Sequence, residues 1–209
     1  NSQTFTNKKA LRRKIVSAGH KRRSSHFIIN LLTMKSLLTG IAFLLSTTMI
    51  PAQRIDLDDS FTEKLEAAGL EFLAPLDAGY KDIAVWRNPY QSFDFAIRSR
   101  REKLEIRYLI EPWRADDRSF LAPHVKATRL LLHLATNNQD MVMTGLDVEP
   151  DVLREQFNAD WGKVFFFQPK QGFSRSPNCK MLALFKKGKG MAYVLFLFDE
   201  PGPELDFRF

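Results

Sequence analysis

The stretch MLALFKKGKGMAYVLFLF, residues 181–198, decides the fold of this chain. Its two arms, residues 181–185 and 192–198, are apolar or aromatic at every position, and the segment 186–190 between them holds the glycines that a tight turn needs. A strand without a polar face is covered on both sides. The stretch therefore predicts two central strands of a sheet, with helices or loops packed over each face. Residues 164–167, VFFF, have the same character and predict a third.

Further upstream, residues 93–98 and 104–110 alternate apolar and polar side chains with period two, apart from Ala96. A charged turn, residues 99–103, joins them. This pattern predicts a β-hairpin with one wet face. Its arginines are interpreted as solvated face and turn residues, with an anion site as the alternative. They are Arg98, Arg100, Arg101 and Arg107.

Residues 58–68 favour a helix, because Ser60 and Glu63 have capping-box spacing and Gly69 suits the position after the last turn. Residues 123–136 favour a second helix that starts with a proline. Its inner stripe is expected to be Ala127, Leu131 and Leu134. A third, short helix is expected at residues 150–157, and short strands at residues 83–87 and 141–143.

This order of elements predicts an α+β fold, an antiparallel sheet of about five to six strands flanked by two to three helices. In element order, residues 69–198 resemble exported α+β domains of the PsbP/Mog1 type. The chain departs from that type because it lacks a clear closing helix and inserts the polar turn 158–162 ahead of a strand. The resemblance implies a fold, and it carries no functional residue over to this chain.

Residues 34–53, MKSLLTGIAFLLSTTMIPAQ, have the layout of a secretory signal peptide, with a basic start, a short apolar run and a small-residue end. They divide the chain into a basic leader at residues 1–33, a signal peptide at residues 34–53 and a single domain at residues 54–209. That domain is expected to be exported to the periplasm or secreted. There is no cysteine at the cleavage point, so a lipid anchor is not expected.

Two interpretations of residues 1–33 remain open. In the first, translation starts at Met34 and the upstream stretch is not made. In the second, the stretch is a basic cytoplasmic tail on an uncleaved membrane anchor. In the second case residues 27–52, interrupted only by Lys35, are long enough to span a bilayer. Both interpretations deliver the domain to the same side, and only the N-terminal segment would contact a membrane.

The positive charge of the chain belongs to the leader. The whole chain carries +7, but residues 1–53 hold nine of the 31 Lys and Arg residues and none of the 24 Asp and Glu residues. The domain from residue 54 onward therefore carries 22 − 24 = −2. A domain of that charge does not attract a polyanion, so nucleic acid is not expected as a partner of the mature domain.

Sequence motifs for catalysis are missing. No glycine-rich phosphate loop follows a strand, and neither GxSxG nor HExxH occurs. The domain has one cysteine and two histidines, too few for a zinc site, and nine positions place His124 and His133 on opposite faces of their helix. No catalytic, cofactor-binding or metal-binding residue is assigned, and no cofactor is expected.

The 12-residue polar loop 168–179 is the one stretch that suits a site. One hypothesis makes Cys179 a catalytic thiol. The alternative is a surface connection whose last residue, Cys179, turns inward as the next strand begins. Trp161 and Phe173 either form an aromatic patch for a partner or fill the core. The groups that would serve the thiol are Lys170 and Arg175 as cations, and His124 or His133 as base.

The sequence thus predicts an exported bacterial accessory or binding domain that is not catalytic. Its partner would be an unknown protein or small ligand in the cell envelope. A thiol-dependent enzyme using Cys179 and a membrane-anchored domain with a basic cytoplasmic tail are the alternatives.

Overall fold

The computed structural model describes residues 55–84, 87–138, 143–203, 205 and 208. The expectations for residues 1–33 and 34–53 lie outside this part of the chain, as does most of the strand expected at 141–143. Within these residues, seven strands form one antiparallel sheet in the order β1-β2-β3-β7-β6-β5-β4. The strands are β1 (Lys81–Asp82), β2 (Phe95–Ser99), β3 (Leu104–Pro112), β4 (Thr144–Asp147), β5 (Trp161–Phe167), β6 (Asn178–Lys186) and β7 (Gly190–Phe198).

In the part of the chain that the structure describes, three α-helices cover the sheet, which confirms the α+β class. They are α1 (Asp59–Ala68), α2 (Pro123–Leu134) and α3 (Pro150–Glu155), and two 3₁₀ turns accompany them, η1 (Leu76–Ala78) and η2 (Arg118–Leu121). The expected count of five to six strands was too low. The two edge strands are short and exposed. Strand β1 has only two residues, and β4 has four residues, all of them exposed. Such short or fully exposed strands leave little hydrophobic pattern in the sequence.

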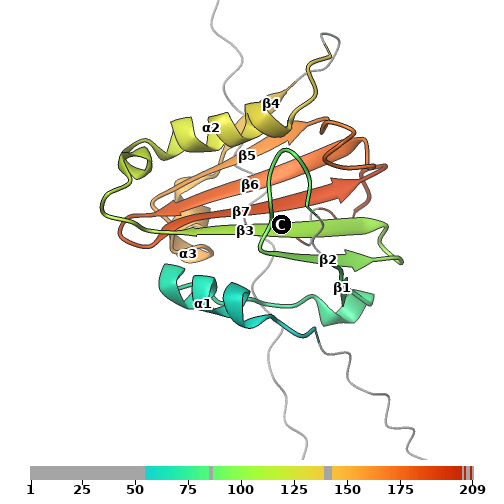
Figure 1. Ribbon diagram of the computed structural model, residues 1–209, viewed down its shortest axis with the longest axis horizontal. Coiled ribbons are helices and arrows are strands. Elements are labelled where there is room, and N and C mark those ends of the chain that lie inside the picture. Colours follow the sequence, from blue (N-terminus) through green and yellow to red (C-terminus); the bar gives the residue numbers. More distant parts are fainter. Residues whose placement is uncertain (1–54, 85–86, 139–142, 204, 206–207, 209) are drawn as a thin grey trace, which may run out of the picture. The chain divides into compact units, whose positions relative to one another are not determined.

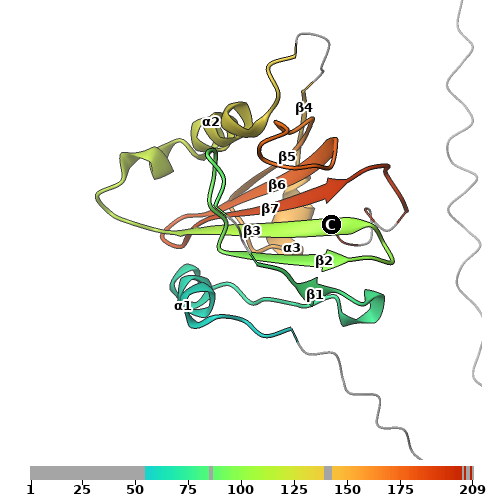
Figure 2. The same cartoon turned by 45° about the vertical axis from the view of Figure 1, so that its right-hand side comes forward.

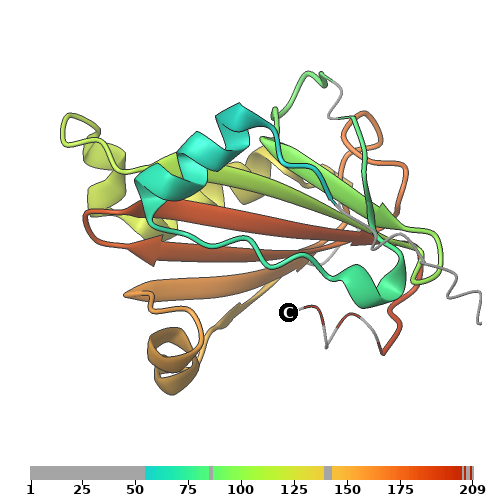
Figure 3. The same cartoon turned by 90° about the horizontal axis from the view of Figure 1, so that it is seen from below.

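The helices lie on opposite faces of the sheet (Figure 1). Helix α2 packs on one face, and α1 packs on the other, an arrangement that persists when the molecule is turned (Figure 2). Seen from below, α1 lies along the sheet while α3 sits toward the β4 edge of that same face (Figure 3). The central strands β6 and β7 are therefore covered on both sides, as their apolar sequence predicted.

Helix α2 buries the predicted stripe of Ala127, Leu131 and Leu134. On the other face, α1 buries Phe61 and Leu65, but its cap differs from the expected one. The carboxylate of Asp58, not Ser60, accepts the hydrogen bond from the Phe61 amide at 2.7 Å. The expected end of the helix is confirmed, since Gly69 adopts the left-handed conformation with φ 64°.

The wet face expected for the β2–β3 hairpin was wrong. Glu105 and Arg107 point to the α2 side of the sheet and are only 6% and 7% exposed. Phe93, which precedes β2, and Phe173, from the loop 168–179, pack over the Arg107 guanidinium and cover this face. Opposite charges two positions apart on one strand face neutralise each other, and this pairing permits their burial.

The polar turn expected at 158–162 ends two residues earlier than expected, because Trp161 and Gly162 already belong to β5. Gly162 is needed there for packing. A Cβ at this position would lie 2.6 Å from Leu153 Cδ2, so a side chain would force the Leu153 side chain out of its place between α3 and the sheet.

Arg208 ties the C-terminal segment to the β2–β3 turn. Its Nη2 donates to Glu102 Oε1 at 2.7 Å and to Asp77 Oδ2 at 3.0 Å. The Tyr80 hydroxyl donates to the other Glu102 oxygen at 2.6 Å. The hydrogen bond from Arg208 is the main cause of the lowered pKa of Glu102. Leu205 is buried in the core beneath α1, so hydrophobic contact adds to this anchor.

Candidate functional site

A cavity of about 230 Å³ lies between β3 and two loops. Its walls come from residues 87–89 and residues 171–175, and Arg107 of β3 contributes from the sheet. Three of its lining residues are arginines, so we call it the arginine pocket: Arg87, Arg107 and Arg175. The loop 168–179 that the sequence singled out does form one wall of this pocket.

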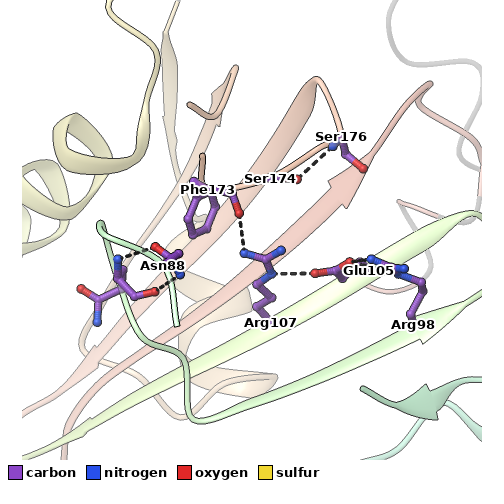
Figure 4. Close-up of polar contacts among 8 residues, drawn as sticks. Asn88, Arg98, Glu105, Arg107, Phe173, Ser174 and Ser176 are labelled. Atoms are coloured by element: carbon purple, nitrogen blue, oxygen red, sulfur yellow. Dashed lines mark hydrogen bonds and ion pairs between the residues drawn. The ribbon is translucent and has the colours of Figure 1, made fainter. Parts of the chain in front are cut away.

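Arg107 is held in place by two hydrogen bonds and two aromatic rings (Figure 4). Its Nε donates to Glu105 Oε1 at 2.6 Å, and its Nη1 donates to the Phe173 carbonyl at 2.9 Å. The guanidinium carbon lies 4.8 Å from the ring centroid of Phe173 and 5.6 Å from that of Phe93. A buried cation is tolerated only with such partners, and they also pre-organise it for a ligand.

Glu105 serves two arginines at once. Its Oε2 accepts hydrogen bonds from Arg98, from Nε at 3.0 Å and from Nη2, while its Oε1 accepts from Arg107. One carboxylate therefore balances two guanidinium groups, and the row Arg98–Glu105–Arg107 keeps one positive charge in excess.

The first loop is shaped by Asn88. Its side-chain oxygen accepts hydrogen bonds from the amides of Tyr90 and Gln91, both at 2.9 Å, and its side-chain nitrogen donates to the Gln91 carbonyl at 2.6 Å. An asparagine that bonds its own backbone two and three residues on is a common way to fix a turn. The Asn88-Pro89 sequence thus gives this wall a defined shape.

The second loop is fixed in the same way. The amides of Phe173 and Ser174 both donate to the Lys170 carbonyl, at 2.8 and 3.1 Å. The Ser174 hydroxyl oxygen accepts from the Ser176 amide at 3.0 Å (Figure 4). A Cβ on Gly172 would lie 3.1 Å from the Tyr90 ring, so glycine allows the two loops to approach each other.

The charge of the pocket is positive. No Asp or Glu is among its lining residues, and its two rim arginines, Arg87 and Arg175, are exposed. Within the described part of the chain, neither rim arginine has an ion-pair partner. The pocket is therefore suited to an anionic group.

The structure does not assemble the thiol site. Cys179 is 1% exposed and lies in the core under α2. Burial raises the pKa of the Cys179 thiol, because desolvation of the thiolate outweighs the opposite effect of the nearby Arg107 charge. A catalytic thiol would need a lowered pKa, so this environment does not favour the thiol hypothesis, and the inward-turning alternative is confirmed. At neutral pH this thiol stays protonated.

The other residues proposed for the thiol site have different partners. The Lys170 ammonium donates to the His133 carbonyl at 2.7 Å and lies 5.1 Å from the centroid of the Tyr90 ring. The His133 Nε2 lies 2.7 Å from the Tyr90 carbonyl. Together they tie the Asn88 turn to α2. His124 is exposed at the start of α2.

The two aromatic residues behave as core residues. Phe173 is buried beside Phe93, with ring centroids 5.4 Å apart, and Trp161 is half-buried against the same core. Core filling, rather than an exposed patch, is confirmed for Phe173. Its backbone carbonyl has the additional role of binding Arg107.

Sequence reasoning named Arg107 only as one of four hairpin arginines, with an anion site as the alternative to a solvated face, and it missed Arg87. A signal for Arg107 was present, because Glu105 and Arg107 are two positions apart on a strand and so share a face as opposite charges. No comparable signal marks Arg87, which reaches the pocket only through the fold.

A second, larger cavity of about 540 Å³ lies beside α2. Lys126 is already paired there, since its Nζ lies 2.9 Å from Glu111 Oε2 and 2.9 Å from the Ser119 hydroxyl, which leaves Arg129 as the one arginine of the lining without an ion-pair partner among the described residues. Its Tyr193 hydroxyl donates to the Met191 sulfur. This internal pairing leaves the second cavity with less unmet charge than the arginine pocket.

No metal site is evident within the described residues, where no three His, Cys, Asp or Glu side chains gather. Nor does any helix there have the length and hydrophobicity to cross a membrane. Protein-family models, curated proteins and solved structures give no significant match to the chain.

Proposed function

We propose that residues 54–209 form an exported, non-catalytic binding domain of the bacterial envelope or medium, and that it takes a small ligand in the arginine pocket. The signal-like sequence at 34–53 supports export. The observation that carries the binding function is a preformed cavity whose two loops are fixed by their own hydrogen bonds.

The size of the cavity favours a small molecule over a protein partner. A water molecule occupies about 30 Å³ in the liquid, so 230 Å³ corresponds to about eight waters. That is below the range of about 300–1,000 Å³ typical of sites for drug-sized ligands. The ligand is therefore a compact molecule or the polar end of a longer one.

A screen of small fragments by protein NMR tests this function, with the protein purified from cells that express the whole chain. Gln171→Trp adds bulk at the pocket wall without a change of charge, since Gln171 is an exposed lining residue. Gln156→Trp, at the exposed end of α3, is the matched control. We expect fragments that bind the wild type and the control but not Gln171→Trp. An absence of binders, or binders indifferent to Gln171→Trp, would count against the proposal.

Export and anchoring are tested separately by N-terminal sequencing of the protein recovered from cells. A mature start near Gln53 or Arg54 supports a released domain. An intact basic leader on a membrane-bound protein supports the anchored alternative instead. The thiol-enzyme alternative requires an accessible thiolate, a requirement that the burial of Cys179 does not favour.

A further inference from the structure

The arginine pocket has more positively charged groups than nearby carboxylates to neutralise them. Arg98 and Arg107 share the single carboxylate of Glu105, so one positive charge remains there. Arg87 and Arg175 add two more at the rim. Residues 54–209 as a whole carry −2, so this concentration of positive charge is local and not a property of the surface in general.

From this arrangement we infer that the ligand carries a doubly charged oxyanion of the phosphate class, bound by Arg87, Arg107 and Arg175. The inference rests on the proposed function, because it names the chemical class of the ligand for the same pocket. A phosphate group carries about −1.5 to −2 at pH 7, which matches the two rim arginines that lack a partner within the described residues.

The donors of the pocket suit an oxyanion. Arg107 uses Nε and Nη1 for Glu105 and Phe173, and among the described residues none accepts from its Nη2. Arg107 lines the pocket and is 7% exposed, so part of this side chain faces the cavity. A guanidinium held rigidly, with a nitrogen left to donate, suits the oxygens of a phosphate group.

Ser174 supplies a neutral donor beside these charges. Its oxygen accepts from the Ser176 amide, so its hydroxyl proton is left to donate, and the residue lines the cavity. Charged donors on two loops and one strand, with a hydroxyl among them, form a cradle for a tetrahedral anion. The small volume and the net negative charge of the domain disfavour a polyanion such as nucleic acid.

The test is a titration of the purified protein with inorganic phosphate, methyl phosphate and acetate at constant ionic strength, followed by NMR. We expect saturable binding of at least one phosphate compound and much weaker binding of acetate. Arg87→Gln and Arg175→Gln should each weaken phosphate binding by about tenfold, because each removes charge-assisted hydrogen bonds. Arg100→Gln, on the exposed β2–β3 turn, removes the same charge elsewhere and should change binding by less than about twofold.

Each outcome decides the proposal. Tighter binding of inorganic phosphate points to the free ion, and tighter binding of methyl phosphate points to an organic phosphate. The inference is overturned if phosphate and acetate bind with equal affinity. It is also overturned if neither Arg87→Gln nor Arg175→Gln changes the affinity for phosphate. If neutral fragments bind and Gln171→Trp blocks them while phosphate fails, the binding function stands and only the ligand class falls. If nothing binds, both fall.

Discussion

Replacement of Arg107 by methionine should destabilise the domain strongly. The change leaves Glu105 Oε1 without its donor at a carboxylate that is buried from solvent, and it leaves the Phe173 carbonyl without its donor as well. Arg98 still compensates the Glu105 charge in this variant, so the loss is that of two buried hydrogen bonds, which together typically contribute about 2 to 4 kcal/mol. We therefore expect a loss in that range for Arg107→Met.

Arg98 provides the matched comparison, because it binds the same carboxylate from the solvent side. Its side chain is 55% exposed, so water and salt screen its pair with Glu105. Arg98→Gln is expected to destabilise the domain by no more than about 1 kcal/mol. The two variants remove the same charge and differ mainly in the burial of the arginine.

A double variant separates the lost pair from lost packing. Glu105→Leu with Arg107→Met removes the buried carboxylate together with its partner, and apolar replacement of a buried pair is often close to neutral. We expect the double variant to be more stable than Arg107→Met alone. Urea unfolding followed by tryptophan fluorescence measures all of these free energies. The reasoning is wrong if Arg107→Met is as stable as Arg98→Gln, or if the double variant is the less stable of the pair.

The remaining predictions concern a thiol, a turn and a charge network. Cys179 should resist a thiol reagent at pH 8 in the native protein and react after unfolding; rapid native reaction would instead support the thiol enzyme. Gly190→Ala should cost about 2 kcal/mol or more in urea unfolding, because φ is +123° and a Cβ would lie 2.1 Å from the Glu111 carbonyl oxygen. Gly188→Ala, with φ +73° and open space around it, should cost about 1 kcal/mol, and equal losses would refute the steric argument. Since Arg208 lowers the pKa of Glu102, the stabilisation of that carboxylate is present above its unfolded pKa of about 4.3 and is lost as pH falls through the lower folded value. Arg208→Gln should therefore lose less stability than the wild type between about pH 5 and pH 3, as judged by unfolding at several pH values.

Local patterns in the sequence predicted the central elements well. The stripe of α2 and the doubly covered strands β6 and β7 follow from periodicity alone, since each depends on which side chains of one element face the core. The cap of α1 shows the limit of such patterns. Asp58 and Ser60 are both good capping residues, and only the backbone geometry decided in favour of Asp58.

The candidate site was predicted in part. The length and polarity of the loop 168–179 identified one wall of the arginine pocket. Arg107 was interpreted as a solvated residue, because strand alternation shows that a face is polar but not what covers it. The carbonyl that receives Arg107 belongs to Phe173, 66 positions further along the chain, and no local pattern connects two positions so far apart.

The sequence alone was enough for the α+β class, the central strands, the main helix and the contrast in charge between basic residues 1–53 and the slightly acidic remainder. These properties depend on composition and on the periods of helix and strand, which neighbouring residues express directly. Only the tertiary structure decided that Cys179 is buried and that three arginines from separate segments share one cavity. Burial and shared electrostatics arise from contacts between distant parts of the chain, so they exist only once the sheet has closed and its loops have met.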